Sequence, residues 1–437
     1  MLIRGIRAVL KAAKDLDPNI RVIYATILLL GVAYGLAISL IANFLEKRGF
    51  KKEEIGSLAI WFAGGIVALS IPSGALIRRF SGKAVLVASL SGYAVTVFLF
   101  PFMPSYLTIG GLRFLDGAFS VGVWVSSETI LLSRAPPKDK AHVTSLYAIS
   151  LALGYVIGPI LSHEIAPKLG TRAAFITAGI IATLTAMMVW LRLEKDDLAS
   201  PHHADGPPSE VTLGEGGLAA RLSAGAESVP EKELSTGAIF KLIKASCLAT
   251  FSYGYFQASM VLFLPLFLKE SKGLTEDDTI LVPAFFAAGM LLFANLAARL
   301  GDRVGHLVVM RVLGAIGTLT IVSFLLVSQN VLIYVLVFLA GASLASVSPV
   351  SLALQGTVVA QRDLSRAGGL YNASYALGML LGPPITSQIY GKISGEAMLQ
   401  HFAILWAAFV VFTIVFRRDD PRVRGEATLG ELATTKR

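Results

Sequence analysis

Long apolar segments separated by short polar loops fill most of this 437-residue chain and constrain its fold more than any other feature. A helix needs roughly 20 apolar residues to cross the hydrocarbon core of a bilayer. Twelve segments have about this length, near residues 21–45, 55–77, 84–103, 105–133, 141–163, 172–193, 239–268, 279–300, 306–327, 330–356, 366–391 and 397–416. Apolar residues make up 54% of the chain and charged residues 15%, which excludes the soluble globular classes. Because strand-like alternation is missing from these segments, we expect an all-α membrane protein.

An internal repeat relates the two halves of the chain, and each half contains six of the apolar segments. A constant offset of 224 residues aligns Gly117 with Gly341, Tyr147 with Tyr371, Gly154 with Gly378, and Gly158-Pro159 with Gly382-Pro383. The sequence therefore predicts 12 transmembrane helices in two pseudo-symmetric six-helix bundles.

Three charged residues of the first half break this repeat. Arg113, Asp116 and Glu128 align with the apolar residues Val337, Ala340 and Leu352. A charge near the bilayer midplane costs at least ~2.5–3.5 kcal/mol on insertion scales, so charges retained there point to function. The internal repeat thus predicts the architecture, and the three charged residues that break it predict the functional site.

Polar segments divide the chain into five predicted regions. These are a cytoplasmic amphipathic segment (1–20), an N-terminal bundle (21–193), a flexible cytoplasmic linker (194–238), a C-terminal bundle (239–416) and a cytoplasmic tail (417–437). The linker is rich in Gly, Pro, Ser and acidic residues and has no apolar period. Its His202-His203 pair is more often solvated than metal-binding, and the single Cys247 excludes a Cys-based metal site. We expect no metal and no cofactor.

The distribution of charge predicts the topology. The net charge is +9, and Lys and Arg gather in alternate loops rather than on one face, which argues against a nucleic-acid partner. Around 46–54, in a loop on the opposite side, basic residues are diluted by glutamates. By the positive-inside rule we place both termini in the cytoplasm and the chain in the cell (inner, cytoplasmic) membrane. The first residues carry charges throughout, so no cleavable signal peptide is expected.

A loop motif follows the second apolar segment of each half. Residues 298–306 read A-R-L-G-D-R-V-G-H, whereas the first half keeps Gly82 and Lys83 but has Arg79 at the position of the acid. With twelve helices and a long central loop, this motif resembles the G-x-L-x-D-R-x-G-R/K loop of the major facilitator superfamily of secondary transporters. The resemblance covers nearly the whole chain. It implies a conformational latch made by Asp302, Arg303, Gly305 and Gly82.

In that family the acid of the loop pairs with the positive end of a helix in the opposite half. In this chain only Asp302 can do so, and we expect its partner at the start of the fifth helix near Ala141. Arg79 departs from the pattern, so a symmetric second latch is not expected.

Two further motifs strengthen the resemblance. Arg113 to Gly117 matches R-x-x-x-G in the fourth helix. A G-x-x-x-G-P motif occurs in the fifth helix and again in the eleventh, and its helix-bending residues are Gly154, Gly158, Pro159, Gly378, Gly382 and Pro383. In the family the copy in the fifth helix is common among drug/proton antiporters. Close packing of neighbouring helices explains glycines four residues apart equally well.

Asp116 is the deepest carboxylate in the chain and shares a helix face with Arg113. Desolvation favours its neutral form and Arg113 favours its charged form, so the sequence leaves the balance open. We predict Asp116 as the principal proton carrier, Arg113 as its modulator, and Glu128, nearer the cytoplasmic end, as the second choice. A purely structural ion pair is the alternative.

The resemblance also implies which side chains line the substrate path, because the family places the first, fourth, seventh and tenth helices around it. With polar and aromatic residues of neighbouring segments, the predicted cavity residues are Tyr34, Ser120, Trp124, Tyr253, Phe256, Gln257, Tyr371, Asn372 and Tyr375. Such walls suit apolar organic solutes. Core packing or contact with lipid is the alternative for each aromatic ring.

No P-loop, H-E-x-x-H or G-x-S-x-G sequence is present, so ATP-driven transport and the common hydrolases lack support, and we expect no enzyme. The main hypothesis is proton-coupled export of an apolar or amphipathic compound by alternating access. Uptake of a sugar or organic acid by proton symport is the second, and a non-transporting receptor or enzyme on the same fold is the third. The expected partners are the lipid bilayer, a small-molecule substrate and protons, and we expect a monomer.

Overall fold

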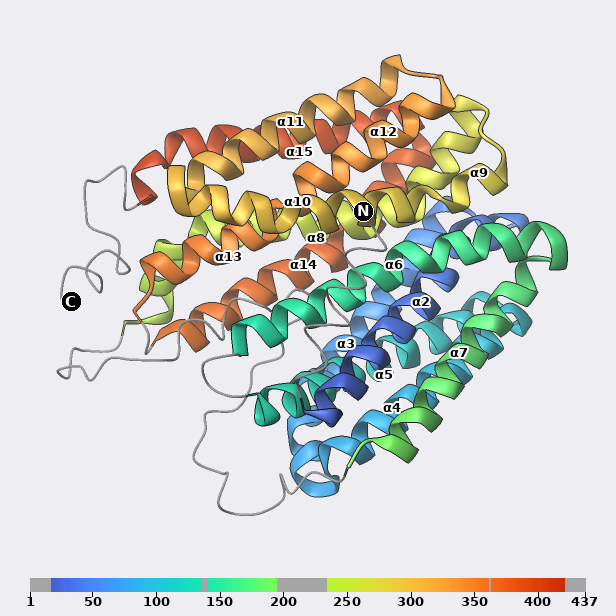
Figure 1. Ribbon diagram of the computed structural model, residues 1–437. Helices are drawn as coiled ribbons and strands as arrows, with labels where there is room; N and C mark the ends of the chain where they lie inside the picture. The colour runs from blue at the N-terminus through green and yellow to red at the C-terminus, as the bar shows by residue number, and fades with distance from the viewer. Residues whose placement is uncertain (1–16, 136–139, 195–233, 361–362, 421–437) are drawn as a thin grey trace. The chain divides into compact units, whose positions relative to one another are not determined.

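A computed structural model describes residues 17–135, 140–194, 234–360 and 363–420, and these residues form helices and no strands (Figure 1). The helices of the first repeat are α2 (Pro18–Lys47), α3 (Lys52–Phe80), α4 (Gly82–Leu99) with the 3-10 turn η1 (Phe100–Phe102), α5 (Tyr106–Arg134), α6 (Lys140–Leu169) and α7 (Thr171–Arg192). Those of the second repeat are α8 (Thr236–Lys272), α9 (Glu276–Ile280), α10 (Val282–Val304), α11 (His306–Leu326), α12 (Asn330–Ala340), the π-helical turn η4 (Gly341–Ala345), α13 (Val347–Val358), α14 (Leu364–Lys392) and α15 (Gly395–Val415), with η6 (Arg417–Asp419) at the end.

The prediction of an all-α membrane fold is confirmed. Within the described ranges, ten helical segments are long and apolar enough to cross a membrane. The other two expected spans coincide with α5 and α14, which are helices of 29 residues each. At 1.5 Å per residue such a helix is about 43 Å long, which exceeds the ~30 Å hydrocarbon core. Ionic side chains lower the apolar character of α5, because Arg113, Asp116 and Glu128 lie within it.

The helices gather into two compact units. Among the described residues, those within 1–37 and 61–224 form unit 1, and those within 38–60 and 225–437 form unit 2. The division therefore runs through α2 and α3, so that the turn joining these helices packs with the second repeat. Residues 1–16, 195–233 and 421–437 lie outside the described ranges, and with them most of the predicted amphipathic segment, linker and tail.

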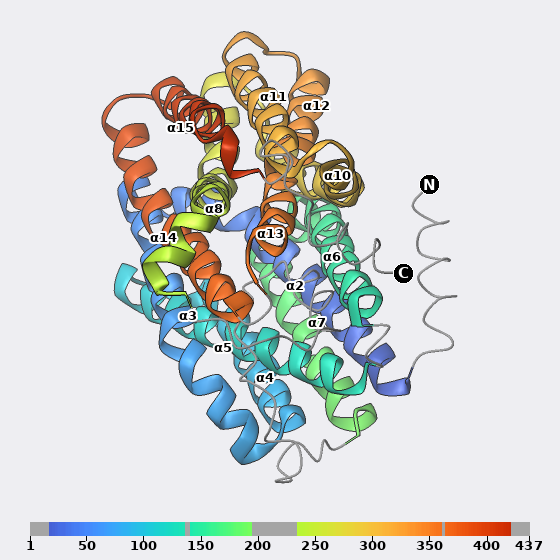
Figure 2. The same ribbon diagram turned by 90° about the vertical axis from the view of Figure 1, so that its left-hand side faces the viewer.

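Within unit 1, α4 lies beside both α5 and α7 (Figures 1 and 2). Within unit 2, α11 lies beside α15, and α8 beside α14. The offset of the repeat maps α4 and α7 onto α11 and α15, so one pairing of helices occurs in both halves.

The repeat extends to the contacts between backbones. In the first repeat a Cβ added to Gly65 would lie 1.8 Å from the carbonyl oxygen of Phe114, and one added to Gly117 would lie 2.0 Å from that of Phe62. In the second repeat the corresponding distances are 2.1 Å from Gly289 to Phe338 and 2.0 Å from Gly341 to Phe286. The two contacts of the first repeat map onto the two of the second at the offset of 224. Glycines therefore allow the same close helix crossing in both repeats.

Two turns also obey the offset. Gly49 and Gly273 end their helices with φ values of 84° and 71°. Ser81 and Gly305 precede α4 and α11 with φ values of 86° and 104°. Ser81 is the one non-glycine residue with positive φ among the described residues, and its hydroxyl accepts a hydrogen bond from the Ala84 amide. A serine thus occupies a strained position that the second repeat gives to glycine.

Candidate functional site

The polar face of α5 in unit 1 carries the charges that break the repeat. A capping box between Ser105 and Thr108 fixes the start of this helix. Arg113 and Asp116, one turn apart, form an ion pair through Nη1 and Oδ2. Their side chains are 16% and 14% exposed, so the pair is mostly removed from solvent. The guanidinium of Arg113 also lies 4.4 Å from the centroid of the Phe62 ring, over its face.

A short series of hydrogen bonds connects this ion pair to α2. The Ser120 hydroxyl donates to the Asp116 main-chain oxygen at 2.6 Å, with the Oδ1 carboxylate oxygen at 3.4 Å as a second acceptor. The Tyr34 hydroxyl in turn donates to Ser120 Oγ. Both Tyr34 and Ser120 are buried. The structure thus brings together three of the predicted residues of unit 1, Asp116, Ser120 and Tyr34, and holds Arg113 beside them.

Aromatic rings from three other helices surround Tyr34. Its ring centroid lies 4.6 Å from that of Tyr93, 6.4 Å from that of Trp124 and 6.3 Å from that of Tyr155. The aromatic group comprises Tyr34, Tyr93, Trp124 and Tyr155. Tyr93 and Tyr155 were not predicted from the sequence, because a tyrosine in an apolar helix carries no signal of its partners.

Glu128 lies on the same helix as Asp116 but twelve residues later. Twelve residues correspond to about 18 Å along a helix axis, so Glu128 lies well away from the Arg113–Asp116 pair along α5. Beside it, the Ser127 and Tyr147 hydroxyls are 3.0 Å apart. The offset of the repeat maps this contact onto Ser351 and Tyr371, whose hydroxyls are 3.1 Å apart.

In unit 2 the predicted cavity residues fall into separate groups. Tyr375 donates a hydrogen bond to Gln257 Oε1 at 2.7 Å, and its ring centroid lies 6.0 Å from that of Tyr253. Tyr371 is buried and also bonds to Ser348. Asn372 is the next residue of α14 and is partly buried. Tyr253 is also buried, whereas Gln257 and Tyr375 are partly buried.

Phe256 has a different environment from its predicted neighbours. It is fully buried, and its ring meets Phe402 and Trp406 of α15 edge-on, with centroids 5.4 and 6.1 Å apart. Such T-shaped contacts are typical of a packed aromatic core. The structure therefore places Phe256 among the core side chains of unit 2.

The G-x-x-x-G-P glycines lie where helices cross. A Cβ on Gly154 would lie 2.6 Å from the Gly31 Cα, and one on Gly158 would lie 2.6 Å from the Gly35 Cα. In unit 2, added Cβ atoms on Gly378 and Gly382 would lie 2.2 and 2.5 Å from the carbonyl oxygens of Phe251 and Tyr255. Pro159 and Pro383 follow these glycines inside α6 and α14. The motif thus marks the closest approach of α2 to α6 and of α8 to α14.

The predicted latch loop joins α10 to α11. Asp302 pairs with His306 Nε2 at 3.2 Å and is 64% exposed. Gly305 has a φ of 104°, and Asp420 Oδ2 lies 2.9 Å from the Cβ that another residue would place there. Arg303 is exposed, and Gly82 begins α4 in the corresponding loop of the first repeat. The predicted contact of Asp302 near Ala141 stays a prediction, because the side chain of Ala141 lies outside the described residues.

The turn between α2 and α3 holds ionic contacts within unit 2. Lys269 of α8 forms an ion pair with Glu46. Further contacts join Lys47 to Glu276 at 2.6 Å, Lys52 to Glu270 at 2.7 Å, Tyr390 to Glu270 at 2.7 Å and Asn43 to Thr279 at 2.9 Å. From the sequence alone, this loop shows only that glutamates dilute its basic residues. Their partners are distant in sequence, so the pairing could not be predicted.

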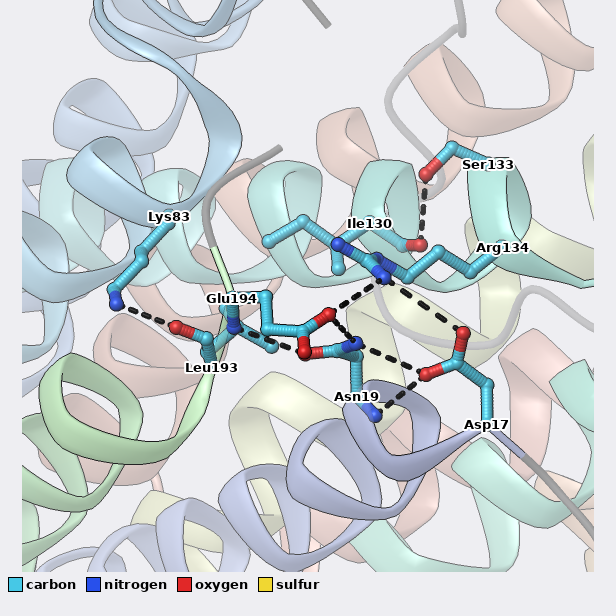
Figure 3. Close-up of polar contacts among 8 residues, drawn as sticks. All are labelled: Asp17, Asn19, Lys83, Ile130, Ser133, Arg134, Leu193 and Glu194. Carbon is cyan, nitrogen blue, oxygen red and sulfur yellow. Dashed lines mark hydrogen bonds and ion pairs between the residues drawn. The ribbon is translucent and has the colours of Figure 1, made fainter. Parts of the chain in front are cut away.

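A second polar cluster joins helix ends in unit 1 (Figure 3). The Arg134 guanidinium lies between the carboxylates of Asp17 and Glu194, at 3.7 and 3.6 Å. The Asn19 amide donates to both carboxylates, at 3.0 and 2.9 Å, and accepts from the Glu194 main-chain N–H at 2.9 Å. The Lys83 ammonium donates to the Leu193 carbonyl. Asp17 precedes the N-terminus of α2, and Arg134 lies in the last turn of α5. Each charge therefore interacts favourably with the dipole of that helix.

Comparison with known proteins agrees with this architecture. A family model described as the Major Facilitator Superfamily matches residues 23–327 and 246–436. An uncharacterized MFS-type transporter of Methanocaldococcus jannaschii is 21% identical over 404 residues, which cover 90% of this chain and 97% of the relative. The multi-drug resistance efflux pump PmrA of Streptococcus pneumoniae is 21% identical over 410 residues, covering 91% of this chain and 95% of the pump.

Solved structures show the same fold. The nucleoside transporter NupG superposes with a TM-score of 0.67 at 13% identity, covering 91% of this chain and 98% of that one. A bacterial homolog of the human lysosomal transporter Spinster gives a TM-score of 0.66 at 13% identity and covers 91% and 95% of the two chains. The resemblance noted in the sequence is therefore confirmed. The chain belongs to the Major Facilitator Superfamily and is a multi-pass membrane transporter.

Proposed function

We propose that this transporter exports a small apolar or amphipathic organic compound in exchange for protons, by alternating access, and that Asp116 carries the proton. One observation supports this most strongly. The Arg113–Asp116 ion pair is mostly buried and connects through Ser120 to Tyr34 in the aromatic group. In an antiporter the carboxylate must lose its proton when the substrate binds. It therefore needs an ionic partner for its charged form and a connection to the residues that contact the substrate.

Protonation of Asp116 would remove the charge that holds Arg113. The guanidinium would keep its position over the Phe62 ring, and the Ser120 hydroxyl would keep its bond to the Asp116 main-chain oxygen. These two contacts do not depend on the charge of the Asp116 carboxylate, which supports a role in which Asp116 takes both protonation states. A proton-coupled transporter requires this property, because the same residue must be charged in one step and neutral in another.

The aromatic character of the surroundings supports an apolar or amphipathic substrate. Tyr34 and its neighbours offer flat apolar faces with polar edges, and Tyr253 and Tyr375 offer similar faces in unit 2. A multi-drug resistance efflux pump among the relatives agrees with export. We further propose that both termini are cytoplasmic, that the protein is a monomer in the cell membrane, and that Asp302 belongs to a conformational latch.

Proton symport of an organic acid is the second candidate. It is favoured by Arg113, because protonation of Asp116 would leave a guanidinium available to an anionic group of the substrate. The two candidates differ in the direction of proton movement. Export by exchange moves protons opposite to the substrate, whereas symport moves both together.

Proteoliposomes with an imposed pH gradient and an internal pH dye test the proposal. Addition of flavone, a planar apolar compound, should dissipate the gradient with the wild-type protein and not with empty liposomes. Asp116→Asn should abolish this dissipation while flavone binding persists. Glu128→Gln makes the same chemical change on the same helix and should retain at least half of the rate. Unchanged dissipation with Asp116→Asn would remove Asp116 from the proposed role.

A further inference from the structure

Two buried hydrogen-bond donors of the aromatic group have no partner. The Tyr93 hydroxyl and the Trp124 indole Nε1 are both inaccessible to solvent and form no hydrogen bond. Tyr93 as a whole is 1% exposed. By contrast, the Tyr34 hydroxyl in the same group donates to Ser120. A buried donor without an acceptor leaves the loss of its hydration uncompensated, and phenylalanine would avoid this cost at either position.

The rings that carry both donors lie beside one ring, because Tyr93 and Trp124 neighbour Tyr34 from two different helices. Tyr155 stacks nearly parallel to Tyr34, with an interplanar angle of 24°. Trp124 and Tyr155 are only partly buried, so part of the surface of these two rings stays exposed. A flat molecule that packs against this exposed surface meets aromatic rings of a group that holds two unpaired donors.

The chemistry of these donors limits the ligand. An indole N–H can only donate, so its partner must be an acceptor such as a carbonyl or ether oxygen. An organic cation without acceptors would leave both donors unsatisfied. The carboxylate of Asp116, which could attract such a cation, is already paired with Arg113.

We propose that the aromatic group binds a planar, uncharged aromatic compound that presents two hydrogen-bond acceptors, one to Tyr93 and one to Trp124. This inference rests on the proposed function and names its substrate class. Tyr34 links this site to the proton carrier, because it contacts both donor side chains and bonds through Ser120 to Asp116. A ligand that moves the Tyr34 ring therefore changes the hydrogen bonding of Asp116.

Equilibrium dialysis of the purified, full-length protein tests the site without any gradient. The probes are 7-methoxycoumarin and flavone, which are planar, uncharged and carry at least two acceptor oxygens each. Naphthalene serves as a planar probe without acceptors, and ethidium as a planar cation. The coumarin and flavone should bind more tightly than naphthalene by about tenfold or more, since two hydrogen bonds are gained.

Tyr93→Phe and Trp124→Phe each remove one donor and keep a ring. Each should weaken binding of 7-methoxycoumarin and flavone about 3- to 10-fold and leave naphthalene binding unchanged. Tyr93→Phe, which keeps the ring, should also raise the melting temperature of the ligand-free protein, because an unsatisfied buried donor is lost. Trp406→Phe is the matched control. Its Nε1 is also buried without a partner, but it lies in the core of unit 2. It should leave the affinity for every probe unchanged.

Three results would overturn the inference. The first is wild-type affinity for both acceptor probes in Tyr93→Phe and Trp124→Phe. The second is failure of either acceptor probe to bind, and the third is tighter binding of ethidium than of both acceptor probes. The two assays distinguish failure of this site from failure of the proposed function. If flavone dissipates the pH gradient but binds independently of Tyr93 and Trp124, only the site is wrong. If flavone binding depends on them but no gradient is dissipated, only the proton coupling is wrong.

Discussion

Arg113 and Asp116 form an ion pair within one turn of α5, at positions where the second repeat has Val337 and Ala340. The duplicated scaffold therefore accommodates apolar residues at these sites without losing its fold. This relationship argues that the charges serve the activity of the first repeat rather than its architecture.

Removing one partner of this pair should destabilise the protein more than removing both. Arg113→Gln leaves a mostly buried carboxylate unpaired, and we expect a loss on the order of 2 kcal/mol. Breaking a fully buried pair costs ~3–5 kcal/mol, and the residual exposure of both side chains reduces that cost. The double variant Arg113→Leu with Asp116→Asn should recover most of the stability and none of the proton-coupled activity. Thermal unfolding in detergent, together with the gradient assay, measures both quantities. Recovered activity in the double variant would make the pair structural.

The glycines of the helix crossings should resist even a single added methyl group. In Gly154→Ala the new Cβ would lie 2.5 Å from the Leu28 carbonyl oxygen and 2.6 Å from the Gly31 Cα. Both are backbone atoms, so α2 and α6 must separate, and the melting temperature should fall by several degrees. Gly111→Ala is the control, because nothing lies within 4 Å of its Cβ position on α5. That change should stabilise the helix by up to about 1 kcal/mol. Equal melting temperatures for the two variants would contradict the described crossing.

The ion pair between Glu46 and Lys269 should control how firmly the turn between α2 and α3 is held in unit 2. Lys269→Glu places two carboxylates together, and we expect amide hydrogen exchange in residues 38–60 to accelerate about fivefold or more. Such a change corresponds to roughly 1 kcal/mol, which is typical of partly exposed pairs. The exchanged pair, Glu46→Lys with Lys269→Glu, should restore slow exchange.

A control for this experiment is Lys168→Glu, which breaks the pair with Glu164 in α6. Those side chains are 69% and 60% exposed, so their contact is screened by solvent. Exchange in residues 38–60 should not change in this variant. Slow exchange in Lys269→Glu would show that other contacts hold the turn.

The sequence predicted the helices well, because their length and apolar composition depend only on local residues. It also predicted the repeat, and the structure extends that repeat to backbone contacts such as Gly65 with Phe114 and Gly289 with Phe338. Charges inside a membrane helix are costly, so Arg113 and Asp116 stood out without any knowledge of the fold.

What the sequence could not predict were partners that depend on tertiary packing. Tyr93 looks like any other aromatic residue of an apolar segment, and only the structure places its ring beside Tyr34 and leaves its buried hydroxyl without an acceptor. Lys269 and Glu46 are 223 residues apart in the sequence, and no local pattern joins them. Phe256 was predicted in the substrate path from its helix, yet the direction of its ring depends on Phe402 and Trp406.

Proton release on ligand binding tests the central claim most directly. In weakly buffered detergent solution with a pH indicator, addition of flavone to the wild-type protein should release protons over the pH range in which Asp116 is protonated before binding. Asp116→Asn should bind flavone and release none, whereas Glu128→Gln should release as many as the wild type. Release of the same number of protons by Asp116→Asn, or binding by the wild type without release at any pH, would contradict the assignment of Asp116 as the proton carrier.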